Sequence, residues 1–178
     1  SQSKNLLMKS HLTLVGALLL FVAGCSVNSA DRPEKALENK PAPNFKLDLL
    51  GGGEVELAKL KGKNIVLLDF WATWCGPCRQ VMPTLVQVAK DYNAKGVRYL
   101  AVNLREDPEK IKSYLQQAKL DIEVPLDKDG SVAGLYKVKG IPTMVIVGKD
   151  GIVKNVHVGS SPNLKAELTK ALDKILAE

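Results

Sequence analysis

The chain has 178 residues, enough for one globular domain with short appendages. Its apolar fraction of 46% and charged fraction of 25% are ordinary for a protein with a buried core, which excludes a wholly disordered chain and a multi-span membrane protein. The net charge of +6 is modest and the basic residues are scattered, so we expect no nucleic-acid partner. Three cysteines are too few for a disulfide-stapled scaffold, and two histidines are too few for most zinc sites.

The N-terminal region predicts an export signal. Residues 12–23 form an apolar run after Lys9, and this run is too short to cross a bilayer, which takes about 20 apolar residues. Met8 is a candidate start of the natural chain. The run ends in the letters VAGC, which resemble the lipobox of bacterial lipoproteins, where lipid is attached to the cysteine. We therefore predict a lipoprotein-type signal peptide at 1–24 and lipidation of Cys25.

A second interpretation of this region remains open, namely plain signal cleavage near Gly24 or Ala30 with Cys25 incidental. In both cases the residues that follow are polar, contain prolines and have no apolar period. We expect residues 25–43 to comprise the lipidated cysteine and a flexible tether, and residues 44–178 to form one domain.

The domain is predicted to open with a β-hairpin, because apolar residues alternate on both sides of three glycines at 51–53. Near-continuous apolar runs at 65–70 and 97–104 predict two strands buried on both faces. Two further strands, at 143–147 and 152–158, are joined by an Asp-Gly turn. Helices are expected where apolar residues recur at helical spacing, at 76–94, from 108, at 131–136 and from 162.

This order of elements predicts an α/β domain. We expect a central mixed β-sheet with helices on both faces and an N-terminal β-hairpin extension. The two strands that are joined through a helix should be parallel, and the last two strands should form an antiparallel hairpin.

Two cysteines at the spacing C-x-x-C stand between a predicted strand and a predicted helix. Free N–H groups and the positive end of the dipole at a helix N-terminus favour a thiolate, so the pKa of Cys75 is expected to fall. Cys75 is therefore the predicted nucleophile, and Cys78, one turn further on, can attack the resulting mixed disulfide. Pro77 suits the first turn because its missing N–H costs nothing there. Trp74 is expected to flank the exposed sulfur.

A zinc half-site and a purely structural disulfide are the alternatives for this pair. A structural zinc site takes four ligands, and the chain has no second C-x-x-C and only His157 after the signal region. A structural bridge would hardly close so small a loop. Redox chemistry is therefore favoured, and we expect neither a metal nor another cofactor.

The letters DFWATWCGPC at 69–78 resemble the active-site segment of thioredoxins almost residue for residue. The letters GIPT at 140–143 are similar to the cis-proline loop of that family. The lead hairpin and the insert at 105–136 resemble the TlpA/ResA-like branch of exported, membrane-anchored thioredoxins. The resemblance spans about residues 41–178 and implies a thioredoxin-like fold with a helical insert.

The resemblance also implies roles for individual residues. Cys75 corresponds to the exposed nucleophile, Cys78 to the resolving thiol, and Asp69 to a buried acid that relays a proton to and from Cys78. Pro142 corresponds to the cis-proline, next to Ile141, whose backbone would bond an extended substrate. The residues expected to bind substrate are Trp74, Gly76, Pro77, Ile141 and Pro142.

An independent argument supports the assignment of Asp69. An Asp in an apolar strand is costly to bury as a charge, so its pKa should be raised, which suits a proton carrier near neutral pH. Two alternatives stay open: Asp69 could cap nearby backbone, and Pro142 could be a trans-proline that opens a strand. Trp71 is expected to pack in the core and His157 to be an exposed strand residue.

The function implied is an exported thiol–disulfide oxidoreductase that reduces protein disulfides and receives electrons from a membrane protein. We expect a lipid-anchored monomer that faces the periplasm or extracytoplasmic space. Cytochrome c maturation members of the branch usually carry Glu three residues after the second cysteine, where this chain has Val81. Dedicated apocytochrome reduction is therefore kept as an alternative.

Two other function classes compete with this interpretation. A peroxidase of the peroxiredoxin type would carry the pattern P-x-x-x-[ST]-x-x-C, which is missing from this sequence. A copper chaperone that resembles thioredoxins would use C-x-x-x-C and a histidine, and the cysteine spacing here differs.

Overall fold

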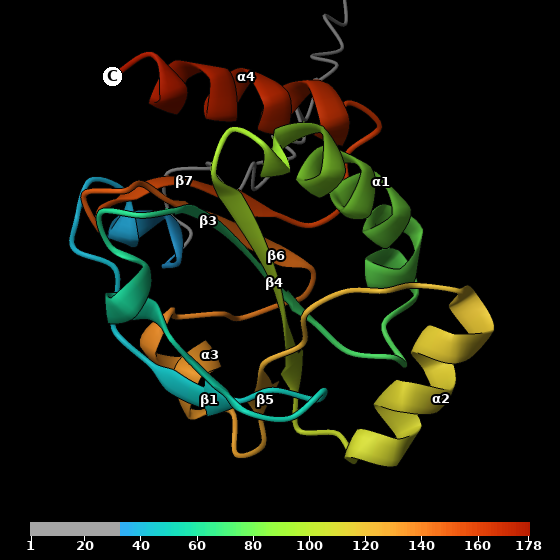
Figure 1. Ribbon diagram of the computed structural model, residues 1–178. Coiled ribbons are helices and arrows are strands. Elements are labelled where there is room, and N and C mark those ends of the chain that lie inside the picture. The colour runs from blue at the N-terminus through green and yellow to red at the C-terminus, as the bar shows by residue number, and fades with distance from the viewer. Residues whose placement is uncertain (1–32) are drawn as a thin grey trace, which may run out of the picture.

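The structure is a computed structural model, and it describes residues 33–178. Its centre is a five-stranded mixed sheet in the order β5-β4-β3-β6-β7 (Figure 1). β3 pairs in parallel with β4 and antiparallel with β6, and β6 pairs antiparallel with β7, which confirms the predicted mixed sheet. The strands are β3 (Ile65–Trp71), β4 (Val97–Leu104), β5 (Leu126–Asp127), β6 (Thr143–Val147) and β7 (Val153–Val158).

The predicted hairpin forms a separate two-stranded sheet, in which β1 (Lys46–Asp48) pairs antiparallel with β2 (Glu54–Glu56). Its turn needs glycine, because Gly52 and Gly53 have φ angles of 94° and 78° in the left-handed region. A 3₁₀ helix, η3 (Leu57–Leu60), follows directly and returns the chain to the main sheet.

Helices cover both faces of the sheet, as predicted. The odd-numbered apolar residues of β3 join one core cluster with α1 and α4, whereas its even-numbered residues join a second cluster with the hairpin and α3. This division follows from the alternation of side chains along a strand. Figure 1 shows α1 and α4 together on one side of the sheet. The helices are α1 (Gly76–Asn93), α2 (Pro108–Ala118), α3 (Ser131–Leu135) and α4 (Leu164–Leu176).

The segment before the hairpin is part of the folded domain. It contains a 3₁₀ helix, η2 (Lys35–Leu37), whose Leu37 side chain is buried in the second core cluster. The backbone N–H of Asn39 donates to the carbonyl of Val153 at 2.8 Å, and the N–H of Val153 donates to the carbonyl of Lys40 at 2.9 Å.

These contacts correct the predicted domain boundary at Asn44. The expectation of a flexible tether is wrong for residues 33–43, because their apolar and backbone groups find partners on β7 and in the core. The rest of that tether, the predicted signal peptide and Cys25 lie outside the described residues. Within residues 33–178, no helix is both long enough and apolar enough to span a membrane.

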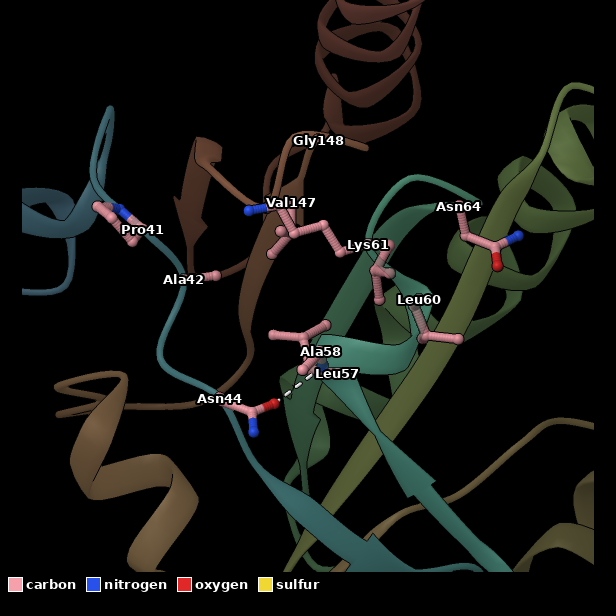
Figure 2. Close-up of a pocket in the computed structure, with 12 residues that line it drawn as sticks. Pro41, Ala42, Asn44, Leu57, Ala58, Leu60, Lys61, Asn64, Val147 and Gly148 are labelled. Carbon is pink, nitrogen blue, oxygen red and sulfur yellow. Dashed lines mark hydrogen bonds between the residues drawn. The ribbon is translucent and has the colours of Figure 1, made fainter.

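A pocket of about 150 Å³ lies between this N-terminal segment, η3 and the far end of β6 (Figure 2). Asn44 stands at its side and accepts a hydrogen bond from the backbone N–H of Ala58 at 2.8 Å. The lining residues of the central sheet, Val66 and Val147, lie at the start of β3 and the end of β6. The pocket is therefore at the opposite end of these strands from the cysteine pair.

Candidate active site

The antiparallel pairing of β3 with β6 brings two predicted motifs together. Phe70 near the end of β3 lies opposite Thr143 at the start of β6. The chain that leaves β3 toward α1 and the chain that enters β6 therefore meet at one end of the sheet. As a result, the Sγ of Cys75 lies 3.7 Å from the carbonyl oxygen of Ile141, 66 residues further on.

Cys75 and Cys78 form a disulfide at the start of α1. Cys75 is the N-cap residue of this helix, and its Sγ accepts a hydrogen bond from the backbone N–H of Cys78 at 3.2 Å. In the reduced protein the same donor and the helix dipole would stabilise a Cys75 thiolate. Cys78 is fully buried, whereas Cys75 keeps 4% of its surface exposed. Of the two cysteines, Cys75 is thus the one that keeps any exposed surface.

The predicted substrate-binding residues surround Cys75. Trp74 is 67% exposed, and Gly76 and Pro77 are also exposed, so the turn into α1 presents a surface on both sides of the nucleophile. The half-buried Ile141 completes this surface from the β6 side.

The Ile141–Pro142 peptide bond is cis, which excludes the trans-proline alternative. Two hydrogen bonds fix the loop around it: the N–H of Gly159 donates to the Pro142 carbonyl at 2.8 Å, and the Thr143 hydroxyl donates to the Gly140 carbonyl at 2.7 Å. The loop is therefore held by β6 on one side and by the end of β7 on the other.

Asp69 is completely buried on β3. Its Oδ2 accepts a hydrogen bond from the Tyr99 hydroxyl at 3.1 Å, and within residues 33–178 its Oδ1 has no hydrogen-bond partner. Burial raises the pKa of Asp69 to about 7, although the Tyr99 hydrogen bond opposes this shift. The raised pKa was predicted, and the alternative that this carboxylate caps nearby backbone is wrong.

The alternation along β3 places Asp69 on the α1 face of the sheet. Its neighbours at positions 67 and 71 both belong to the core cluster that contains Cys78. A group that exchanges a proton near neutral pH thus lies on the same side of the sheet as the buried thiol.

Two residues that sequence reasoning missed complete the site. Among the described residues Tyr99 supplies the side-chain hydrogen bond to Asp69, and it comes from the neighbouring parallel strand. Glu106, in the link between β4 and α2, accepts hydrogen bonds from the backbone and the hydroxyl of Thr73. The sequence gives no motif for either residue, and both contacts depend on how β3 and β4 pair.

Three further expectations can be compared with the structure. Trp71 is buried, as predicted, and its Nε1–H donates to the Ala101 carbonyl at 3.1 Å. Val81 is buried on α1, so the position where the cytochrome c branch carries Glu holds an apolar side chain. His157 was expected to be exposed, but its side chain is 18% exposed and its Nδ1 lies 3.0 Å from Glu167, because β7 packs against α4.

No cluster of three or more His, Cys, Asp or Glu side chains in the described part of the chain could hold a metal ion. The groups that the site brings together are the Cys75–Cys78 disulfide and, on the α1 face of the sheet, the buried carboxyl of Asp69.

Comparison with known proteins agrees with this geometry. Residues 39–156 match the model of the AhpC/TSA family. The thiol-disulfide oxidoreductase ResA of Bacillus subtilis (strain 168) is 35% identical over 161 residues, which cover 89% of this chain and 88% of the relative.

The chain is also similar in structure to solved thiol–disulfide oxidoreductases. A proposed thiol:disulfide interchange protein DsbE from Chlorobium tepidum matches with a TM-score of 0.73 and 37% identity, covering 78% of this chain and 97% of the other. A secreted disulfide oxidoreductase of Mycobacterium tuberculosis, homologous to DsbE of E. coli, matches with a TM-score of 0.61 and 27% identity, covering 73% and 95%. The chain thus belongs to the AhpC/TSA family and is a thioredoxin-like thiol-disulfide oxidoreductase of the ResA type.

Proposed function

We propose that this protein reduces disulfides of other proteins at the outer side of a membrane, to which it is anchored through lipid on Cys25. The observation that carries the reductase proposal is the Cys75–Cys78 pair at the start of α1, opposite the Ile141–Pro142 loop. A nucleophile at a helix N-terminus beside the backbone of a loop is the arrangement that an extended peptide substrate requires.

The reaction begins with the dithiol form. The Cys75 thiolate attacks one sulfur of a substrate disulfide, forms a Cys75–substrate mixed disulfide and releases the first substrate thiolate. Cys78 then loses its proton and attacks the Cys75 sulfur. This step forms the Cys75–Cys78 disulfide and releases the second substrate thiolate, so two electrons have passed to the substrate. A membrane protein with a dithiol returns two electrons by the reverse exchange.

Asp69 is the proposed proton acceptor for Cys78. Its pKa of about 7 lets the carboxylate take a proton from the thiol and return it near neutral pH. Trp74, Gly76 and Pro77 contact the substrate on one side of the nucleophile, and Ile141 and Pro142 contact it on the other. The protein acts as a monomer and needs no cofactor for these steps.

The proposal of export rests on the N-terminal sequence and on one relative. The apolar run at 12–23 directly precedes the VAGC letters that end at Cys25. The structurally similar oxidoreductase of Mycobacterium tuberculosis is described as secreted. Mass spectrometry of the detergent-soluble fraction from the native host should find lipid on Cys25, and an unmodified, soluble chain that starts beyond Cys25 would reject the anchor.

The reductase proposal is tested with the pre-reduced protein and insulin as the disulfide substrate. We expect wild type to reduce insulin, Cys75→Ser to be inactive, and Cys78→Ser to accumulate a mixed disulfide that can be isolated from the native host. A parallel peroxide-consumption assay should show no turnover. Rapid peroxide consumption with no insulin reduction would favour the peroxidase alternative instead.

A further inference from the structure

The Glu106 carboxylate forms an anchor under the turn that leads to Cys75. Its side chain is only 4% exposed. Oε2 accepts the backbone N–H of Thr73 at 2.6 Å, and Oε1 accepts the Thr73 hydroxyl at 2.6 Å. The Asn103 side-chain amide donates to Oε2 at 2.9 Å, and the Lys110 ammonium lies 2.9 Å from Oε1.

This anchor fixes the part of the chain that positions the nucleophile. The turn between β3 and α1 is closed from within by a hydrogen bond from the Cys75 N–H to the Ala72 carbonyl at 3.1 Å. Glu106 holds the Thr73 corner of the same turn from outside, through both the backbone and the side chain. Hydrogen bonds to an ionised carboxylate are roughly twice as strong as neutral ones, so the turn is held firmly.

The Glu106 carboxylate also stays negatively charged near neutral pH. Burial by itself would raise the pKa of Glu106, but the hydrogen bonds from Thr73 and Asn103 outweigh it and keep the pKa below its ordinary value. Glu106 is therefore ionised at every pH at which a thiol titrates. By contrast, Asp69 has a pKa of about 7, so its charge changes near neutral pH.

The positive groups around the turn compensate this charge only in part. The Lys110 side chain is 56% exposed, so water screens its interaction with Glu106. Arg79 in the first turns of α1 is also exposed, and its guanidinium lies over the Tyr114 ring at 5.7 Å. A buried, ionised carboxylate is therefore bonded to Thr73, two residues before the nucleophile in the chain, and the cations near it are largely hydrated.

We propose that Glu106 is a positioning residue that also destabilises the Cys75 thiolate by its charge, and so makes the dithiol form a stronger reductant. A negative charge held in the turn that carries the Cys75 thiolate disfavours the reduced protein relative to its disulfide, and this lowers the reduction potential. The inference rests on the thiol–disulfide exchange of the family and holds for either direction of net electron flow.

The test compares charge-altering variants of the full chain in glutathione redox buffers, with Trp fluorescence as the measure of the oxidised fraction. For Glu106→Gln we expect the equilibrium to move about tenfold toward the dithiol, which corresponds to a potential about 30 mV less negative. The Cys75 thiolate fraction at fixed pH, followed by its ultraviolet absorbance, should rise about three- to tenfold.

Lys110→Gln is the matched variant with the opposite change of charge. It removes the partly compensating cation and should move the glutathione equilibrium toward the disulfide, by less than about threefold because Lys110 is exposed. Thr73→Ser retains the hydroxyl and should behave like wild type. Thr73→Val loses the hydroxyl hydrogen bond to Glu106 but leaves the Glu106 charge in place. A purely structural role cannot produce opposite shifts in the two charge variants.

Two outcomes would overturn the inference. In one, Glu106→Gln lowers the melting temperature but leaves the potential and the thiolate titration unchanged. In the other, Lys110→Gln causes no shift or moves the equilibrium toward the dithiol, and this result counts even if Glu106→Gln does not fold. A wild-type protein that equilibrates with glutathione but does not reduce insulin would reject the proposed reductase function and leave this inference in place.

Discussion

Replacing Asp69 with Asn should change the way in which stability depends on pH. Asp69 is completely buried, and burial raises its pKa from 3.8 to about 7. A tenfold difference in proton affinity corresponds to about 1.4 kcal/mol, so the gap between the folded and the unfolded chain amounts to about 4 kcal/mol. Asparagine has nearly the same shape and cannot ionise, so this contribution disappears in the variant.

The direction follows from proton linkage. Between about pH 4 and pH 7 the folded protein keeps the Asp69 proton that the unfolded chain releases. The stabilisation that the raised pKa provides is therefore complete only below about pH 4. This stabilisation is lost as the pH rises toward 7 and beyond, where the folded protein must bury a carboxylate. Relative to wild type, Asp69→Asn should therefore gain up to about 4 kcal/mol between pH 4 and pH 8.

Denaturant unfolding of the oxidised protein from pH 4 to pH 8 measures this difference, because the disulfide removes both thiols from the titration. Tyr99→Phe is the companion variant. It removes the hydrogen bond that opposes the shift, so the pKa of Asp69 should rise further, and the loss of stability should begin at the same pH but continue to higher pH. If wild type and Asp69→Asn show parallel curves over this range, Asp69 does not titrate as a buried acid and the reasoning fails.

Two further predictions concern the cysteine pair and α3. In the reduced protein, iodoacetamide should modify Cys75 well before Cys78, because Cys75 keeps a small exposed surface, Cys78 has none, and Cys75 stands at the helix N-terminus. Faster modification of Cys78 would reverse the roles. Asp127→Ala should cost about 1–3 kcal/mol in denaturant unfolding, because the buried N–H groups of Val132 and Ala133 lose the carboxylate that accepts them at 3.2 and 2.8 Å. A loss below about 0.5 kcal/mol would mean that water replaces this carboxylate.

The main strands and helices could be predicted because each of them is encoded locally. β3 and β4 are buried on both faces, so each shows a continuous apolar run, and α1 starts at a C-x-x-C pair with a proline in the first turn. β5 was missed because it has only two residues, Leu126 and Asp127, and is defined by its pairing with the end of β4.

The rest of the site depends on contacts between distant parts of the chain. The motif around Cys75 and Asp69 could be found in the sequence, whereas the partners Tyr99 and Glu106 are 30 and 33 residues away from the groups that they bond. Leu37 is the one large apolar residue of segment 33–43, and only the folded sheet provides the cluster that buries it. Local sequence patterns therefore identify the reactive residues, whereas their hydrogen-bond partners are visible only in the tertiary structure.

The N-terminal segment that was expected to be a tether covers the edge of the central sheet at β7. β7 is the last strand on its side, and its outward N–H groups at Val153 and Val156 would otherwise be free to pair with another chain. The carbonyl of Lys40 occupies the first donor and the carboxylate of Glu38 the second, at 2.9 and 2.8 Å. A protein shortened to begin at Asn44 would expose both donors, and self-association through strand addition would be the consequence.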